Sequence, residues 1–416
     1  MTDGVAVGAS AVLDPDTYAH GDPSTYGLPL DLYDHLRDEH PVLTQEFPDD
    51  PLMRDRLYVL TRYDDVRGAD GDPETWSSAS VTTVFNFTPL GYEPWQKPAM
   101  IAMDGDDHRR NRAVVSRRLR PTLLPTLEPR FRMLARRLVE RALEIGEPFN
   151  FVAEIAHMMP MEALGEVLGV PEADRPQFFR WVDVFSSPLD PRTAGSLDAV
   201  VEAFGAMFDY SLALVRERQA TPEDDVTTAL AEALTEGRMS EAEVMGNMFN
   251  LASGAAESTR SALSHGVHQL MREPEQLAWL RDRMDDVPGT AVNEILRIAA
   301  PFTHLCRQAT RDVELHGQTI HEGEVICLLW AAANFDPRAF DGPRRFDLAR
   351  ERNALLTFGW GPHSCIGKHI AMLEIKVLLE ELLRATKDMR PAGEISYVRD
   401  IFARGVYDLP VTLVPA

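Results

Sequence analysis

The longest helical pattern in the chain covers residues 241 to 272, and it sets the scale of the fold. The sequence "SEAE" at 240 to 243 is a capping box at its start, and Pro274 follows its end. At about 1.5 Å per residue, such a helix spans roughly 48 Å, enough to cross a large globular domain. Its apolar seam consists of Val244, Met248, Leu251, Ala255, Ala262 and Leu263. We therefore expect one helix that passes through the core.

The middle of this helix is polar, although a helix that crosses a core should be apolar there. The segment "GAAEST" runs from Gly254 to Thr259 and places Glu257 before two hydroxyl residues. Its glycine costs about 1 kcal/mol of helix stability relative to alanine. Taken alone, the segment is explained by a solvated face whose hydroxyl groups bond to the preceding turn. A functional role needs support from other motifs.

The remaining sequence predicts a mainly helical protein with small sheets. Short strand-like runs occur at 56 to 62, at 313 to 330 and near the C-terminus, and Gly317 and Gly323 stand where turns would interrupt the middle run. Loops are expected at 186 to 195 and at 218 to 225, with helical patterns on both sides of each. Because neither loop is typical of a linker, we predict a single domain over residues 1–416.

Composition excludes several classes of function. The chain of 416 residues has 42 basic and 65 acidic residues, so its net charge of −23 argues against nucleic acid or an anionic membrane as a partner. Cysteines 306, 327 and 365 form no close pair in sequence and suit a reducing compartment. The N-terminus lacks the basic start of a signal peptide, and the apolar run from 325 to 333 is too short for a membrane span. We predict a cytoplasmic enzyme.

Cys365 lies in the segment "FGWGPHSCIGKHIA", residues 358 to 371, which has the features of a ligand-binding loop. A helical pattern begins directly after the cysteine, so its sulfur lies at a helix N-terminus, where unpaired N–H groups favour a thiolate. Gly359, Gly361 and Gly367 leave room for a flat ligand, and Phe358 can pack beside the sulfur. An inert buried cysteine is the commoner role, but it does not explain these glycines.

The pattern Phe-Gly-x-Gly-x-His-x-Cys-x-Gly around Cys365 resembles the haem-binding loop of the cytochrome P450 monooxygenases, in particular the soluble bacterial class. The resemblance extends in order along the chain, through "HRRNR" at 108 to 112, "GAAES" at 254 to 258, "EILR" at 294 to 297, Arg307, "NFDP" at 334 to 337 and "FDLAR" at 346 to 350. It implies the fold of that family, in which haem lies between a long central helix and the cysteine loop.

The resemblance also implies the roles of individual residues toward haem b. Cys365 would be the axial thiolate on the iron. The other positions expected at the haem are His108, Arg112, Ala255, Arg307, Phe358, His363 and Gly367, and of these His108, Arg112, Arg307 and His363 match positions that bond the propionates. Glu294 and Arg297 share a helix face, where a solvated pair is the default. With Arg350, the resemblance implies that they form a buried structural network behind the cysteine loop.

Glu257 and Ser258 match the acid-alcohol pair that relays protons for oxygen activation in this family. Two departures concern the same helix. The family usually has threonine where Ser258 stands and glycine where Ala255 stands, while Gly254 would leave room beside the oxygen site. Serine keeps the hydroxyl but lacks the methyl group that restricts its rotamer. Relatives altered here are in some cases slower, leakier or dedicated to non-hydroxylating oxidations.

The substrate is expected to be an apolar small molecule, such as a terpenoid, a sterol, or a polyketide or aromatic natural product. Its expected contacts are Phe85, Phe87, Trp95, Leu251, Phe302, Thr303 and Phe402. Each aromatic residue is equally explained as core. Hydroxylation, coupling and demethylation all stay open. Two other functions on the same fold are a peroxide-driven enzyme, against which Glu257 and Ser258 argue, and a non-enzymatic activator of a partner protein, against which Cys365 argues.

The family resemblance implies O2 as co-substrate, with ferredoxin and ferredoxin reductase as electron donors. Six arginines and no acidic residue occur within "HRRNRAVVSRRLR" at 108 to 120, in a chain of net charge −23. A solvated helix face would also explain this cluster. We expect Arg109, Arg117 and Arg118 to face outward and to attract an acidic ferredoxin, because screening limits the repulsion from distant charges.

Overall fold

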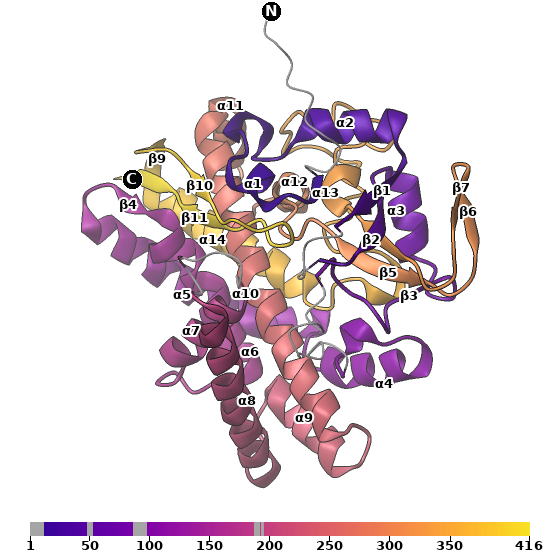
Figure 1. Ribbon diagram of the computed structural model, residues 1–416. Helices are drawn as coiled ribbons and strands as arrows, with labels where there is room; N and C mark the ends of the chain where they lie inside the picture. Colours follow the sequence, from indigo (N-terminus) through magenta and orange to yellow (C-terminus); the bar gives the residue numbers. More distant parts are fainter. Residues whose placement is uncertain (1–11, 48–52, 86–97, 187–191, 193–194) are drawn as a thin grey trace, which may run out of the picture.

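Helix α10 (Glu241–Arg272) runs through the centre of the computed structural model, which describes residues 12–47, 53–85, 98–186, 192 and 195–416 (Figure 1). The predicted bounds and capping box of this helix are confirmed. Ser240 Oγ accepts a hydrogen bond from the Glu243 N–H at 3.2 Å, and the Glu243 carboxylate accepts one from the Ser240 N–H at 2.7 Å. The two bonds satisfy donors that a helix start leaves unpaired.

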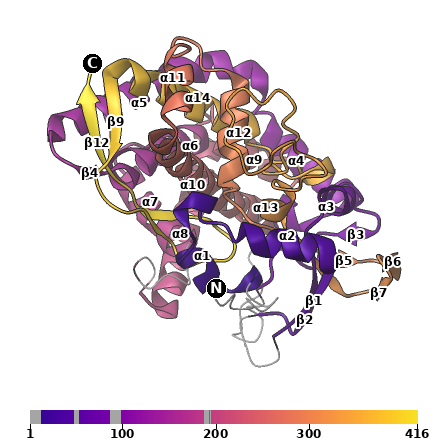
Figure 2. The same ribbon diagram turned by 90° about the horizontal axis from the view of Figure 1, so that it is seen from above.

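Other helices surround α10 on several sides (Figures 1 and 2). The α-helices are α1 (Pro15–Ala19), α2 (Leu30–Glu39), α3 (Tyr63–Asp70), α4 (Gly105–Ser116), α5 (Leu124–Ile145), α6 (Met158–Leu168), α7 (Arg175–Ser186), α8 (Leu197–Ala220), α9 (Val226–Thr235), α11 (Pro274–Arg281), α12 (Gly289–Ala299), α13 (Trp330–Ala333) and α14 (Lys368–Ala385). Shorter helical turns are η2 (Pro23–Thr25), η4 (Met100–Ala102), η5 (Pro121–Leu123), η6 (Val152–Ala156) and η7 (Gly361–His363).

The strands form small sheets on two sides of α10 (Figures 1 and 2). A five-stranded sheet has the order β1 (Val42–Glu46), β2 (Arg56–Leu60), β8 (Val325–Leu328), β5 (Leu305–Ala309) and β3 (Trp76–Ser77). The smaller sheets pair β4 (Phe149–Asn150), β12 (Pro410–Pro415) and β9 (Thr386–Pro391), then β10 (Ser396–Tyr397) with β11 (Val406–Asp408), and β6 (Val313–Leu315) with β7 (Gln318–Ile320). In the five-stranded sheet, β2 and β8 are parallel and the other pairs are antiparallel.

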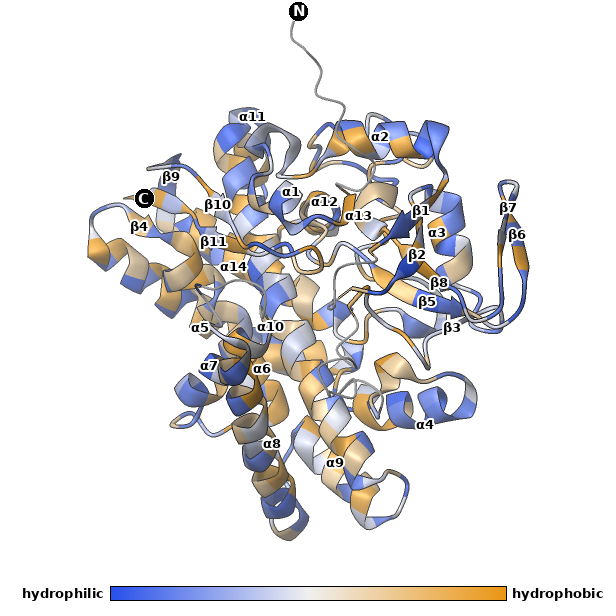
Figure 3. Ribbon diagram, in the orientation of Figure 1, coloured by the Kyte–Doolittle hydropathy of each residue, from blue (hydrophilic) through white to orange (hydrophobic). Residues whose placement is uncertain are grey.

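The main hydrophobic core contains buried residues from Val12 to Val411, so both ends of the described chain contribute to it. The helices around α10 carry both blue and orange residues (Figure 3), as expected of amphipathic helices with one face on a core. A second cluster of buried residues packs α3 against the five-stranded sheet. The predicted fold class, mainly helical with small sheets, is confirmed.

The structure confirms the predicted strands and corrects one loop. Strand β2 and the strands β6 to β8 lie in the predicted runs, and Gly317 (φ +80°) and Gly323 (φ +87°) occupy the turns. The loop expected at 218 to 225 begins later, because α8 continues to Ala220. There Arg218 is buried and donates to Asp225 Oδ2 at 2.6 Å, which stabilises the last helical turn.

The other predicted loop, at 186 to 195, lies mostly outside the described residues. Within the described part of the chain, no helix has both the length and the hydropathy of a membrane span.

Candidate functional site

Cys365 lies between η7 and α14, as the helical pattern predicts. Its backbone N–H donates to the Phe358 carbonyl at 2.7 Å. Gly359 and Gly361 have φ values of +63° and +71°, a region that side chains disfavour. A Cβ on Gly361 would also lie 2.9 Å from the Asp70 carbonyl oxygen. Two of the three glycines are therefore explained by the backbone of the loop and its packing on α3, in addition to any ligand.

The Cys365 side chain faces an internal cavity, so it has accessible surface although protein atoms surround it. Burial raises the pKa of the Cys365 thiol. The N–H groups of Gly367 and Lys368 and the charge of Arg112 lower this pKa, but they do not outweigh burial. The N–H groups at the helix start therefore favour a thiolate, as expected, while burial opposes it. A metal ion bound to the sulfur would favour the thiolate further, because a coordinating metal deprotonates a thiol outright.

The cavity has a volume of about 470 Å³ and lies between α10 and the cysteine loop. It brings together most of the predicted site residues, namely Phe85, His108, Arg112, Leu251, Ala255, Glu257, Ser258, Phe302, Phe358, His363, Cys365, Gly367 and Phe402. The rings of Phe302 and Phe402 stack at a centroid distance of 4.8 Å. The wall away from Cys365 is therefore largely apolar, whereas the cysteine end is polar.

Two predicted residues lie elsewhere, and two cannot be placed. Thr303 is fully buried and does not line the cavity, and its hydroxyl bonds to the Ile401 carbonyl. Arg307 is also absent from the lining, because its guanidinium pairs with Asp70 at 2.7 Å. The same Asp70 carboxylate accepts from the Trp360 N–H at 2.7 Å, so Arg307 is linked to the cysteine loop. Phe87 and Trp95 lie outside the described residues.

Several lining residues were missed at the sequence level. They are Ala163, Leu164, Val167 and Leu168 of α6 and Trp330 of α13. The apolar stripe of α6 is visible in the sequence, but nothing local distinguishes a helix face that borders a cavity from one that packs in the core.

The polar end of the cavity has the chemistry of an anion site. The rings of His108 and His363 lie 4.2 Å apart. The His108 Nε2 is buried without a hydrogen-bond partner, whereas the His363 Nε2 lies 3.7 Å from the Asp104 carboxylate. Arg112 lies beside them and donates to the Ser364 carbonyl at 2.6 Å. Burial and the nearby charges of His363 and Arg112 lower the pKa of His108 to about 4. An anion placed here would remove the charge repulsion and accept hydrogen bonds from these side chains.

Glu257 and Ser258 border the cavity from α10. The Ser258 hydroxyl donates to the Gly254 carbonyl at 2.8 Å, so its oxygen keeps lone pairs that can accept a hydrogen bond from the cavity. This bond to the preceding turn is the one expected from a hydroxyl within a helix. A Cβ on Gly254 would meet no atom within 4 Å, so the protein itself leaves space at this turn.

An ion-pair cluster extends outward from Glu257. Glu257 is only 2% exposed, pairs through Oε2 with Arg260, and has no hydrogen-bond partner for Oε1. Arg260 also lies 3.3 Å from Asp183 Oδ1 and 3.3 Å from His157 Nδ1. The side chains of Asp183 and His157 are 27% and 22% exposed. The cluster thus connects a buried carboxylate beside the cavity to groups that reach solvent.

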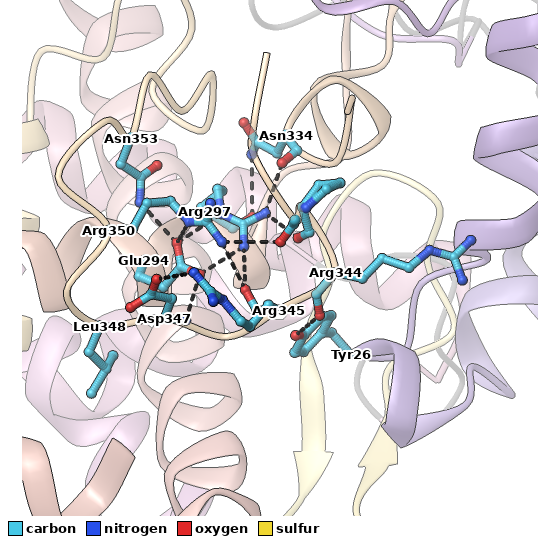
Figure 4. Close-up of polar contacts among 12 residues, drawn as sticks. Tyr26, Glu294, Arg297, Asn334, Arg344, Arg345, Asp347, Leu348, Arg350 and Asn353 are labelled. Atoms are coloured by element: carbon cyan, nitrogen blue, oxygen red, sulfur yellow. Dashed lines mark hydrogen bonds and ion pairs between the residues drawn. The ribbon is translucent and has the colours of Figure 1, made fainter. Parts of the chain in front are cut away.

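Glu294, Arg297 and Arg350 form a buried network beneath the cysteine loop (Figure 4). Arg297 pairs with both carboxylate oxygens of Glu294, at 2.8 and 2.9 Å, and Arg350 Nε binds the same carboxylate at 3.0 Å. Arg297 also donates to the carbonyl groups of Asn334 and Pro343, so the network joins α12 to two loops. Each buried charge is therefore both paired and hydrogen-bonded, which a buried ion needs in order to be tolerated.

Acidic residues outside the segment 108 to 120 partly neutralise the arginines on and after α4. Arg109 pairs with Asp106, and Arg118 pairs with Asp224. Arg110 pairs with Asp107 and with Glu243. Arg117 is exposed and has no ion-pair partner in the part of the chain that the structure describes. The local positive charge is therefore smaller than the sequence segment suggests.

The fold and the site define a class of protein in which a mainly helical chain encloses a cavity with a cysteine sulfur at one end. The family model for cytochrome P450 matches residues 72–387. The methyl-branched lipid omega-hydroxylase of Mycobacterium bovis is 34% identical over 360 residues, which cover 85% of this chain and 83% of the relative. The steroid C26-monooxygenase of Mycobacterium tuberculosis is 32% identical over 88% of this chain and 98% of the relative.

Solved structures agree with these relatives. CYP108D1 from Novosphingobium aromaticivorans superposes with a TM-score of 0.87 at 31% identity, covering 98% of each chain. CYP268A2 from Mycobacterium marinum, solved in complex with pseudoionone, has a TM-score of 0.87 at 29% identity, covering 96% of this chain and 97% of the other. The chain belongs to the cytochrome P450 family and is a monooxygenase of that family.

The residues present fit the haem-thiolate group that the family implies. Cys365 supplies a sulfur that faces the cavity, as the axial ligand must. At the same end, His108 leaves a buried Nε2 atom without a hydrogen-bond partner, and Arg112 adds a cation. Two carboxylate groups would satisfy these donors, and haem carries two propionates.

Proposed function

We propose that this chain, as one domain over residues 1–416, binds haem b and inserts one oxygen atom from O2 into an apolar small molecule in the cytoplasm. The observation that carries this proposal is the cavity itself. It has a cysteine sulfur and the unpartnered His108 Nε2 at one end, and a buried carboxylate and a hydroxyl group on the helix that borders it. Bound haem supplies the iron at which O2 is activated and from which one oxygen atom reaches the substrate.

The chain's own residues divide the remaining work. Cys365 holds the group as a thiolate, and His108, Arg112 and His363 orient it through its carboxylates. Ser258, whose proton is donated to Gly254, accepts a hydrogen bond from water in the cavity. Glu257 passes protons toward that water, and Arg260 holds the carboxylate charged between transfers.

The apolar wall supports an apolar substrate. Phe302 and Phe402 stack and present one continuous aromatic surface, and Leu251 and Phe204 extend the lining. Such a wall excludes water and favours substrates by the hydrophobic area that they bury. The names of two relatives, a methyl-branched lipid omega-hydroxylase and a steroid C26-monooxygenase, are consistent with this substrate class.

The electron source in this proposal is a ferredoxin with its reductase, docked near Arg109, Arg117 and Arg118. A peroxide-driven enzyme is the alternative, and the buried Glu257 beside Ser258 argues against it, because such an enzyme has no need of that proton relay.

The test uses the haem-loaded protein with a ferredoxin, a ferredoxin reductase and NADPH. Terpenoids, sterols and aromatic polyketides are screened first by the change in haem spin state, which reports displacement of water. Each ligand found is then incubated under ¹⁸O2. The expected result is a product that contains one ¹⁸O atom and whose formation needs both the reductase system and O2. Product formation from peroxide alone, at an equal or higher rate, would contradict the proposal.

A further inference from the structure

His304, Cys306 and Cys327 form a compact group inside the five-stranded sheet, apart from the cavity. One ligand-type atom from each lies within 4.8 Å of the others, and all three residues are fully buried. The strand geometry explains this convergence. His304 and Cys306 are two residues apart on one chain segment, so their side chains share a face, and Cys306 lies directly opposite Cys327 in the pairing of β5 with β8.

The group lies behind the cavity wall rather than within it. Leu305, between His304 and Cys306, lines the cavity, whereas His304, Cys306 and Cys327 do not. Because side chains alternate along a strand, Leu305 points to one face of the sheet, and His304 and Cys306 point to the other. The expected haem ligand is Cys365. The proposed reaction does not use His304, Cys306 or Cys327.

Hydrogen bonds determine which nitrogen of the His304 ring carries the proton. The Thr303 hydroxyl donates its only proton to the Ile401 carbonyl, so at 2.7 Å from His304 Nδ1 it can only accept. The Nδ1 atom therefore carries the ring proton, and Nε2 keeps its lone pair. That Nε2 atom is buried and has no hydrogen-bond partner among the described residues. A histidine oriented through one nitrogen, with a free lone pair on the other, has the arrangement of a metal ligand.

From these contacts we infer that His304, Cys306 and Cys327 bind one thiophilic d¹⁰ cation, Cu⁺ or Zn²⁺, through Nε2 and two thiolate sulfurs. Thiolate and imidazole ligands select these metals over Mg²⁺ and Ca²⁺, which prefer oxygen. Ligand atoms about 2.0 to 2.3 Å from a common metal lie less than 4.8 Å apart, so the group needs only a small contraction. Binding releases the two thiol protons to solvent.

Coordination number favours Cu⁺ over Zn²⁺. Zn²⁺ in structural sites takes four ligands, whereas three ligand residues converge here within the described part of the chain. Two thiolates with Cu⁺ leave one negative charge, and the partly buried Arg54 lies within electrostatic range of Cys306 to balance it. The bound cation would join β5 to β8 and, through Thr303, hold the segment that carries Phe402 on the cavity wall.

The test measures metal content, because activity would not distinguish this site from the haem site. Haem-loaded protein is purified from cells grown with added copper or zinc and dialysed against bathocuproine disulfonate and EDTA. We expect about one copper or zinc per haem in the native protein, released when guanidinium unfolds it. X-ray absorption at the edge of that metal should show sulfur and nitrogen neighbours. The edge itself separates Cu⁺ from Zn²⁺.

Variants identify the ligands. The double variant Cys306→Ala/Cys327→Ala should lose the metal, and Thr303→Val should retain less of it, because the ring of His304 is no longer oriented. His265→Gln is the matched control, since His265 is equally buried with an unpartnered Nε2 but belongs to no such group. It should keep the metal.

Three results would overturn the inference: equal metal in wild type and the double variant, an oxygen-only shell from surface binding, or a Cys306–Cys327 disulfide in freshly isolated protein. The absorption spectrum of wild type decides the question even if the double variant does not fold.

Discussion

Glu257 and Arg260 form a buried ion pair one turn apart on α10, where the helix borders the cavity. The pair has two consequences for a proton relay. It gives the buried Glu257 side chain a cationic partner, and it connects that side chain to Asp183 and His157 nearer the surface. Charged side chains therefore extend from the cavity to groups that are partly exposed, with Arg260 between Glu257 and the pair Asp183 and His157.

Removal of the Glu257 charge should slow turnover and spare binding. Because proton relays contribute about 100- to 10,000-fold, we expect Glu257→Gln to lower the rate of product formation within that range. Arg260→Lys, which keeps a cation beside the carboxylate, is the control and should lose much less. Product formation and the substrate-induced spin change are measured on the same preparations. An unchanged rate in Glu257→Gln would exclude this residue from the relay.

The hydroxyl of Ser258 should determine how well reduction is coupled to product. In Ser258→Ala the acceptor oxygen is lost, so we expect more hydrogen peroxide per NADPH consumed. Ser258→Thr keeps the hydroxyl and adds the methyl group that restricts its rotamer, so coupling should be preserved or improved. The ratio of product to peroxide gives the measurement. Wild-type coupling in the alanine variant would show that the hydroxyl has no part in the reaction.

Cys365 should be the residue that gives the haem its thiolate spectrum. Cys365→His replaces a sulfur ligand with a nitrogen ligand of different electron donation. After reduction and exposure to carbon monoxide, the absorption maximum of the variant should move away from the thiolate position. Cys327→Ala, which removes a cysteine that does not line the cavity, should leave this spectrum unchanged. Retention of the thiolate spectrum in Cys365→His would assign the ligand to another residue.

The buried network should matter for stability rather than chemistry. Glu294→Gln leaves Arg297 and Arg350 without their shared carboxylate, and uncompensated buried charges cost about 3 to 5 kcal/mol of unfolding free energy. Arg238→Ala removes an ion pair that both partners expose to solvent, so it should change that free energy by less than about 1 kcal/mol. Denaturant unfolding of the haem-loaded proteins makes the comparison. Equal stability of both variants would refute the structural role.

Charge reversal of Arg109, Arg117 and Arg118 should slow reduction by an acidic ferredoxin, most strongly at low salt, because rim charges act on association rate. Arg117→Glu should have the largest single effect, because Arg109 and Arg118 already pair with acids of this chain. Haem content and substrate affinity are the controls and should stay constant. If the reduction rate changes neither with these substitutions nor with ionic strength, the ferredoxin docks elsewhere.

Local sequence patterns predicted the helices and strands. The positions of the side chains at the candidate site depend on contacts between residues far apart in the sequence. The bounds of α10 follow from a capping box and a proline that act within one turn, and α14 follows from its apolar spacing. The pairing of Arg307 with Asp70 joins residues 237 positions apart, so no local pattern could show that this arginine turns away from the cavity. The partners of Arg260 likewise come from α7 and from the residue after η6.

The contact between the cysteine loop and α3 has a consequence for biosynthesis. Gly361 packs on the backbone of Asp70 and Gly71, and the Trp360 N–H binds the Asp70 carboxylate across 290 positions of sequence. The loop therefore acquires its shape only when a segment made early by the ribosome meets one made near the end of translation. Closing so large a loop is slow, because its entropy is lost before the contact forms. The cysteine loop is accordingly complete only after residues 358 to 371 have been made and have met α3.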